Sequence, residues 1–206
     1  MGTESLLKIA FGVMAVMILG AIGRANHKAQ KQHGARFAQA ANERPVLLWI
    51  RALVAIPLWV VLIGWLFSAD WLSFATVELP DWARWAGVGL AGVVSLLFWW
   101  IHLALGSNYH GAMGLHENHQ LVTDGPYRFV RHPTYVAFPL AMIALFLLSA
   151  NWVLGLVGFI LTTTISLGRA PVEERQLLER FGDEYREYAA RTGRFFPRAL
   201  TRSWPF

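Results

Sequence analysis

The chain has 206 residues, of which 55% are hydrophobic and only 15% are charged. A soluble domain normally has about 45–50% apolar and about 25% charged residues, so the composition favours an integral membrane protein over a soluble one. The absence of cysteine from the sequence excludes disulfides, thiolate metal sites and cysteine nucleophiles. The formal net charge is +5, and because the positive side chains lie next to apolar segments, they indicate membrane orientation and not a nucleic-acid partner.

Apolar blocks close to the length that a bilayer requires, about 17–25 residues, predict five membrane-spanning helices. In chain order these are Ser5–Gly23, Val46–Ser68, Arg84–Leu105, Thr134–Leu148 and Trp152–Gly168. The last two are short, and only Ser149–Asn151 separates them. This spacing predicts a tight helical hairpin, with a bent or partly re-entrant hairpin as an alternative.

The first two spans contain features that bear on their placement. A retained span is favoured over a cleaved signal peptide at the N-terminus, because Glu4 precedes Lys8 and the start of the chain is not clearly basic. The Lys8 ammonium is expected to reach the membrane interface. Pro57 predicts a kink in the second span.

Charges between the spans predict the orientation. The segment Arg24–Arg44 contains Glu43 as its one acid against five bases, whereas Ala69–Asp81 contains three acids and no base. The loop Gly106–Pro133 and the tail Arg169–Phe206 also contain arginines. The positive-inside rule therefore predicts that these three basic segments are cytoplasmic, with the N-terminus outside and the C-terminus inside.

The tail after the last span has a helical pattern of apolar and aromatic residues, and Gly182 predicts a break between two short helices. The first is expected to continue the fifth span and the second to lie on the membrane surface. The sequence has no internal repeat, so we expect one membrane domain over residues 1–206. Residues 1–104 would provide N-terminal spans without a recognisable signature, and residues 105–206 the functional core and tail.

Three polar segments face the cytoplasm in this topology: Leu105–Tyr109, His119–Tyr135 and Arg169–Glu174. Polar groups at a membrane boundary are costly unless they bind something, so function is expected here. Because a hairpin brings its two ends together, we expect the second and third segments to be neighbours in space.

Three motifs stand in a characteristic order. They are G-P-Y-R-x-x-R-H-P-x-Y from Gly125, R-x-x-x-E-E-x-x-L from Arg169 after the apolar hairpin, and F-G-x-E-Y-x-x-Y from Phe181 with a closing proline. This ordered set, over about residues 105–197, resembles the isoprenylcysteine carboxyl methyltransferase family. The wider superfamily of small integral membrane methyltransferases, which includes phospholipid methyltransferases, shares the pattern.

The resemblance implies an all-α integral membrane fold and S-adenosylmethionine as methyl donor, with S-adenosylhomocysteine as product. It implies that Arg169 and Glu173 are the catalytic residues and that Arg169 also binds the substrate. The cofactor-binding residues implied by the motif positions are His119, Gln120, Leu121, Val122, Tyr127, His132, Pro133, Thr134, Tyr135 and Glu173.

The residue types suit this chemistry. Carboxylates and aromatic faces, such as those of Glu173, Tyr127 and Tyr135, suit a cationic sulfonium and an amino group. Methyl transfer to an already ionised carboxylate is an in-line displacement without a general base, so catalysis depends on alignment and desolvation. Arg169 and Glu173 are four residues apart, so they share a face if the segment is helical.

Structural interpretations of the same residues remain open. Arg128 and Arg131 would then serve only as positive-inside anchors. Pro133 would begin a helix at its first position, which is compatible with cofactor binding. Glu173, Glu174 and Glu179 would form a solvated helix face paired with nearby arginines. A metal site is not expected, although four histidines, His102, His110, His116 and His119, suggest one weakly.

The favoured hypothesis is therefore a membrane methyltransferase acting on a lipophilic or membrane-delivered acceptor. A carboxylate oxygen is the preferred acceptor atom, and sulfur and nitrogen remain open. The first alternative is a relative of sterol-type NADPH-dependent double-bond reductases, which are normally longer. The second is a non-catalytic membrane scaffold. Membrane lipids are the other expected partners, and the sequence does not predict an oligomeric state.

Overall fold

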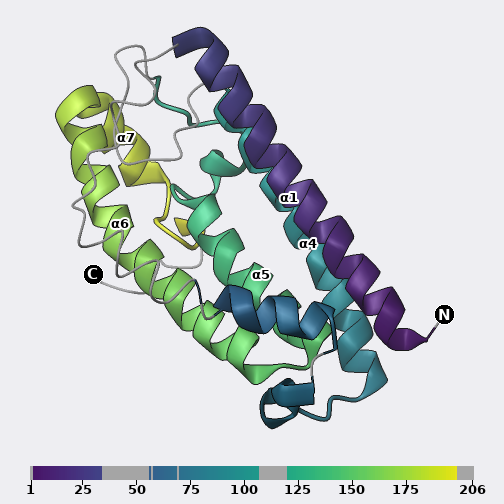
Figure 1. The fold of residues 1–206 in the computed structure, drawn as a ribbon. Helices are drawn as coiled ribbons and strands as arrows, with labels where there is room; N and C mark the ends of the chain where they lie inside the picture. The colour runs from purple at the N-terminus through teal and green to yellow at the C-terminus, as the bar shows by residue number, and fades with distance from the viewer. Residues whose placement is uncertain (1, 34–55, 57, 69, 107–119, 199–206) are drawn as a thin grey trace. The chain divides into compact units, whose positions relative to one another are not determined.

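The computed structural model describes residues 2–33, 56, 58–68, 70–106 and 120–198. Its regular elements over these residues are all helical (Figure 1). The α-helices are α1 (Thr3–His33), α4 (Asp81–Leu105), α5 (Pro133–Ser149), α6 (Gly158–Phe181) and α7 (Asp183–Arg191). Shorter elements are the 3-10 helices η1 (Asp70–Ala75) and η3 (Gly125–Arg128) and the π-helix η4 (Val153–Val157), and residues 58–66 are also helical.

Three of these helical stretches are long and apolar enough to cross a membrane: Thr3–Lys28, Asp81–Leu105 and Val153–Phe181. Helix α5 is also apolar but has only 17 residues. The predicted class, an all-helical integral membrane protein, is confirmed.

The apolar blocks read from the sequence correspond to helices wherever the structure describes them. Ser5–Gly23 lies within α1, Arg84–Leu105 within α4 and Thr134–Leu148 within α5. Trp152–Gly168 begins at η4 and continues into α6, which extends to Phe181 as expected for the start of the tail. The first ten residues of Val46–Ser68, and Pro57 with its expected kink, lie outside the described residues.

The predicted turn between the last two apolar blocks is present. Ala150 has a φ of +49°, which reverses the chain after α5. The Asn151 side-chain oxygen then accepts a hydrogen bond from the Leu154 backbone N–H at 3.1 Å and so caps the start of η4. Beyond the turn, Gly155 lies against Phe146 and Gly158 against Met142, so α5 and the following helix pack closely as a hairpin.

The described residues fall into two compact units. The first is drawn from Met1–Ile18, Arg44–Leu97 and Ala137–Ile165, and the second from Leu19–Glu43, Phe98–Val136 and Ser166–Phe206. The core of the first unit is apolar and contains two clusters. The first cluster consists of Leu7, Met14, Ala91, Ala144 and Leu148, and the second consists of Val61, Trp65, Leu72, Leu145 and Leu154.

Gly87 allows a close approach between α4 and α5 in this first unit. A Cβ atom there would lie 2.6 Å from the Leu147 Cβ and 3.1 Å from backbone atoms of Leu147 and Leu148. We therefore expect Gly87→Ala to lower the free energy of unfolding by about 1–3 kcal/mol, the usual cost of overpacking. Gly89→Ala is the matched control, because nothing lies within 4 Å of a Cβ atom there. Thermal unfolding in detergent measures both, and equal stability of the two variants would contradict the prediction.

Candidate active site

The candidate site belongs to the second unit and begins where the chain enters α5. Val130 forms a parallel bridge with Gly193, which follows α7. The Arg131 backbone N–H donates to the Gly193 carbonyl at 2.8 Å, and that of His132 donates to the Arg194 carbonyl at 3.1 Å. Pro133 then begins α5, where its missing N–H removes no helical hydrogen bond. The Arg131–His132 backbone is thus fixed against the chain that follows α7.

Gly125 is required at the start of this segment for two reasons. Its φ of +60° is in the left-handed region that disfavours residues with a Cβ atom. A Cβ atom there would also lie 3.0 Å from the Ala104 Cβ and 3.3 Å from the Trp100 indole nitrogen. The G-P-Y-R motif therefore begins with glycine because the chain turns tightly against the end of α4.

Glu174 on α6 is the most heavily bonded carboxylate of the site. It accepts hydrogen bonds from the Arg131 Nε at 2.8 Å and from the Arg194 guanidinium, and the His132 Nε2 lies 3.3 Å away. Only 13% of its side chain is exposed. The interpretation of Glu174 as part of a solvated helix face is therefore wrong, whereas Glu179 is exposed.

Arg131 is also more than a membrane anchor. Besides its bond to Glu174, its guanidinium donates to the backbone carbonyls of Ala189, at 3.1 Å, and Thr192. These acceptors lie at the end of α7 and just after it. Arg131 therefore ties three segments together, and the interpretation of it as an anchor alone is wrong.

A second set of side chains surrounds Glu173, the residue before Glu174 on α6. The Tyr135 hydroxyl donates to its Oε1, the Arg169 Nε lies 3.7 Å from Oε1, and the His132 Nδ1 lies 3.7 Å from Oε2. The His132 and Tyr135 rings stack with centroids 5.4 Å apart and planes 12° apart. The Glu173 side chain is 31% exposed. The structure thus joins the two motif segments at a carboxylate that remains accessible.

Helix α7 holds the G-P-Y-R segment through its tyrosines. Tyr185 and Tyr188 are buried, and their rings meet edge to face with centroids 6.1 Å apart. The Tyr188 hydroxyl donates to the Tyr127 carbonyl at 2.7 Å. Burial raises the pKa of Tyr188 above its ordinary value, which keeps this hydroxyl a hydrogen-bond donor across the physiological range.

Tyr185 provides a test of this packing by pH. Burial, and after it the nearby Glu174 carboxylate, raise the pKa of Tyr185 from about 10 to about 12. Because the folded-state pKa is the higher one, the stability from burying the neutral phenol is complete below pH 10 and is lost as the pH rises through about 12. Tyrosinate absorbance during alkaline titration should lose a late component in Tyr185→Phe. A difference spectrum that titrates near pH 10 would contradict the burial.

The structure also describes most of the other residues implied by the resemblance. Gln120, Leu121 and Val122 lie in the non-helical segment before η3, and Thr134 is half-buried in the first turn of α5. His119 lies outside the described residues, as do His110 and His116. The weak metal interpretation therefore stays untested at these three histidines. His102 is buried on α4, with its Nδ1 2.7 Å from the Phe98 carbonyl oxygen.

The sequence did not single out Arg194 and Phe195 as site residues. Arg194 bonds Glu174, and the Phe195 ring centroid lies 6.0 Å from that of His132. Both residues follow α7. Arg194 is one of eight arginines in the tail, and its position in the sequence does not distinguish it from the others. Their role depends on how the chain returns after α7, which no motif encodes.

The described residues thus form an all-helical fold in which apolar helices carry a cluster of polar side chains. The eukaryotic intramembrane Ras methyltransferase, isoprenylcysteine carboxyl methyltransferase, has a similar structure, with a TM-score of 0.62 over 93% of this chain and 67% of that chain. The two sequences are 22% identical, so this similarity concerns the fold alone. Residues 87–179 match the isoprenylcysteine carboxyl methyltransferase (ICMT) family.

Similar sequences include methyltransferases with different acceptors. The protein-S-isoprenylcysteine O-methyltransferase of Schizosaccharomyces pombe is 38% identical over 72 residues, which cover 35% of this chain and 30% of that protein. Methanethiol S-methyltransferase 1 of Bradyrhizobium diazoefficiens is 35% identical over 101 residues, or 44% of this chain and 34% of that protein. The protein-S-isoprenylcysteine O-methyltransferase of Xenopus laevis is 31% identical over 130 residues, or 58% and 45%. The matched parts thus span less than half the length of these relatives.

Proposed function

We propose that this protein is a membrane methyltransferase that uses S-adenosylmethionine to methylate a carboxylate on a lipophilic or membrane-delivered acceptor. The observation that carries the proposal is the convergence of Tyr135, His132 and Arg169 on the accessible Glu173 carboxylate. The match of residues 87–179 to the family supports methyl transfer, and the relatives described above are methyltransferases, which favours this function over the reductase and scaffold alternatives.

The side chains around Glu173 suit a cationic ligand. Glu173 presents a carboxylate with 31% exposure, and the stacked His132 and Tyr135 rings lie beside it. Carboxylates and aromatic faces stabilise cations in this way. S-adenosylmethionine supplies an electrophilic methyl group on a sulfonium when bound. In our proposal Glu173 orients this ligand, with Tyr127, Pro133, Thr134 and the segment His119–Val122 completing its site.

Arg169 is the proposed residue for the acceptor. Arg169 precedes Glu173 by four residues on α6, and its Nε lies 3.7 Å from the Glu173 Oε1. The Arg169 side chain is 19% exposed. A guanidinium binds a carboxylate with directed, charge-assisted hydrogen bonds. In our proposal Arg169 aligns the ionised acceptor oxygen with the methyl group, and the surrounding side chains exclude water.

Sulfur is a second candidate for the acceptor atom. The methanethiol S-methyltransferase relative is 35% identical over 101 residues, comparable with the O-methyltransferase relatives. A thiolate is also anionic, so Arg169 suits it as well. Carboxylate and thiolate acceptors therefore need to be compared directly.

The proposal also includes the topology. Five spans, with the N-terminus outside, place the start of α5 and the end of α6 on the cytoplasmic side. The basic residues in the described parts of the predicted cytoplasmic segments, among them Arg24, Lys28, Arg128 and Arg131, support this orientation.

Ligand binding by the purified full-length protein tests the proposal. In detergent, calorimetry should detect S-adenosylhomocysteine binding, which His132→Ala should weaken. Tight NADPH binding without S-adenosylhomocysteine binding would refute the methyltransferase proposal and support the reductase. If folded protein binds neither ligand, the scaffold interpretation is supported instead.

A second assay identifies the acceptor. With methyl-labelled donor, an S-isoprenylated cysteine with a free carboxylate should be labelled, and the same compound with an amidated carboxyl group should not. Labelling of a simple thiol in preference to the free carboxylate would assign sulfur as the acceptor atom and contradict the carboxylate proposal.

A further inference from the structure

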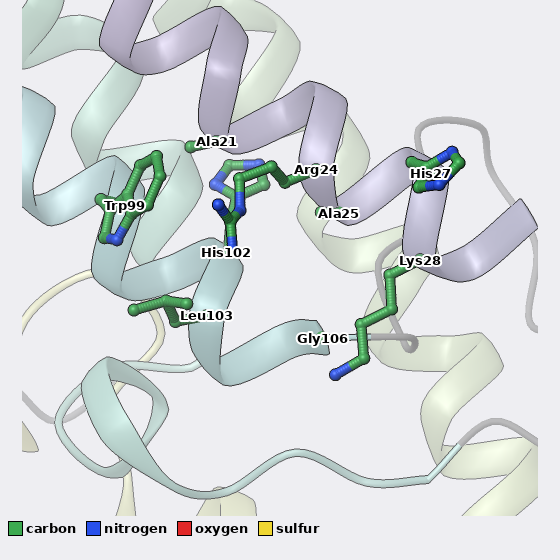
Figure 2. Close-up of a pocket in the computed structure, with 9 residues that line it drawn as sticks. All are labelled: Ala21, Arg24, Ala25, His27, Lys28, Trp99, His102, Leu103 and Gly106. Carbon is green, nitrogen blue, oxygen red and sulfur yellow. The ribbon is translucent and has the colours of Figure 1, made fainter. Parts of the chain in front are cut away.

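A cavity of about 310 Å³ lies between the second half of α1 and the end of α4, within the second unit (Figure 2). Arg24, His27 and Lys28 line it from α1, and none of the described residues that line it is acidic. Its volume is at the lower end of the range for small-molecule sites. None of its residues belongs to the candidate active site.

Two cations are directed from α1 toward α4. Figure 2 shows the Arg24 and Lys28 side chains extending from α1 toward the end of α4, where Lys28 ends beside Gly106. The Arg24 guanidinium lies over the Trp99 ring, 5.3 Å from its centroid. A Cβ atom on Gly106 would lie 3.3 Å from the Lys28 ammonium, so the bare backbone leaves room for it. The C-terminal end of a helix favours a cation, which helps to hold Lys28 at the cavity.

The cavity lies at the depth where the two candidate spans end. One span runs over Thr3–Lys28 and the other over Asp81–Leu105, so Lys28 and the residue before Gly106 are their last members. The cavity therefore combines an aliphatic wall, to which Ala25 and the 60% exposed Leu103 contribute, with cations at the boundary of the apolar zone. Phospholipid head groups lie at the ends of membrane-spanning segments, and basic pockets between membrane helices bind anionic head groups.

We propose that this cavity binds a phosphate group, and that an anionic membrane phospholipid supplies it. The phosphate would lie between the Arg24 guanidinium and the Lys28 ammonium, and the glycerol and upper acyl chain would lie along Leu103. The proposal is independent of the methyl-transfer function.

Lipid retention by the full-length protein tests this site. The protein would be placed in nanodiscs of phosphatidylcholine with a minor fraction of phosphatidylglycerol and then released into mild detergent. Native mass spectrometry would identify the lipids that stay bound to it. Wild type should retain phosphatidylglycerol preferentially. Arg24→Gln/Lys28→Gln should reduce that retention roughly twenty-fivefold, since each cation near the surface contributes about a factor of five. Lys31→Gln/Arg175→Gln removes the same charge from exposed positions that do not line the cavity and should leave retention unchanged.

A second variant separates the cavity from surface charge. Leu103→Trp keeps both cations but fills the cavity, and it should also lose the retained lipid. This variant decides the question if the charge variant does not fold. Retention that survives both cavity variants, or that falls equally in the exposed-charge control, would overturn the proposal. If inorganic phosphate binds the protein in pure phosphatidylcholine nanodiscs as tightly as phosphatidylglycerol binds, soluble phosphate is the ligand and the lipid assignment is wrong.

Discussion

Replacing Glu174 by alanine should lower the free energy of unfolding by about 3 kcal/mol, the lower end of the cost of breaking a buried ion pair. The Glu174 and Arg131 side chains are each only 13% exposed, so the variant leaves a largely buried guanidinium without its carboxylate. It also removes the partner of Arg194 and the neighbour of the His132 Nε2. Thermal unfolding in detergent measures the loss.

The control for this prediction is on the same helix. Glu179 is exposed, so Glu179→Ala should change stability by less than about 0.5 kcal/mol. If the two alanine variants unfold at the same temperature, Glu174 does not hold the segments together as its hydrogen bonds indicate.

Unlike Glu174→Ala, the substitution Glu173→Gln should have a large effect on ligand binding and a small effect on stability. If Glu173 orients a cation, losing its charge should weaken S-adenosylhomocysteine binding about tenfold to hundredfold and abolish most methyl transfer. Because the Glu173 side chain is 31% exposed, the unfolding free energy should fall by no more than about 1 kcal/mol. Calorimetry and thermal unfolding on the same preparation separate the two effects.

Glu179→Gln again serves as the control and should bind the ligand as wild type does. Undiminished S-adenosylhomocysteine binding by Glu173→Gln would remove this residue from the proposed cofactor site. Binding that is lost together with the fold would instead assign Glu173 a structural role.

The elements set by local chemistry could be predicted from the sequence. The hairpin turn at Ser149–Asn151 follows from three residues between two apolar blocks, and the break at Gly182, which has a φ of +53°, follows from glycine after a helical pattern. The meeting of the His132 and Glu173 segments follows from the hairpin. The π-helix η4 had no sequence signal, because its residues continue the same apolar block, Trp152–Gly168, as the start of α6.

The separate roles of Glu173 and Glu174 could not be predicted in the same way. Adjacent residues on a helix project about 100° apart, so one faces the accessible cluster and the other faces Arg131. Which glutamate faces which side depends on the partners of Glu174, which are 43 and 20 residues away in the sequence. The resemblance to the family therefore favoured Glu173, and the sequence left a surface role for Glu174 open.

The pairing of residues 130–132 with residues 193–194 has a consequence for where this protein can be divided. The match to the family model ends at residue 179, yet the backbone partners of Arg131 and His132 come from Gly193 and Arg194. Gly193 is itself tightly enclosed, since a Cβ atom there would lie 1.8 Å from the Phe196 carbonyl oxygen. A fragment cut at residue 179 would leave His132 without these backbone partners, so a fragment that keeps the candidate site intact must extend beyond α7.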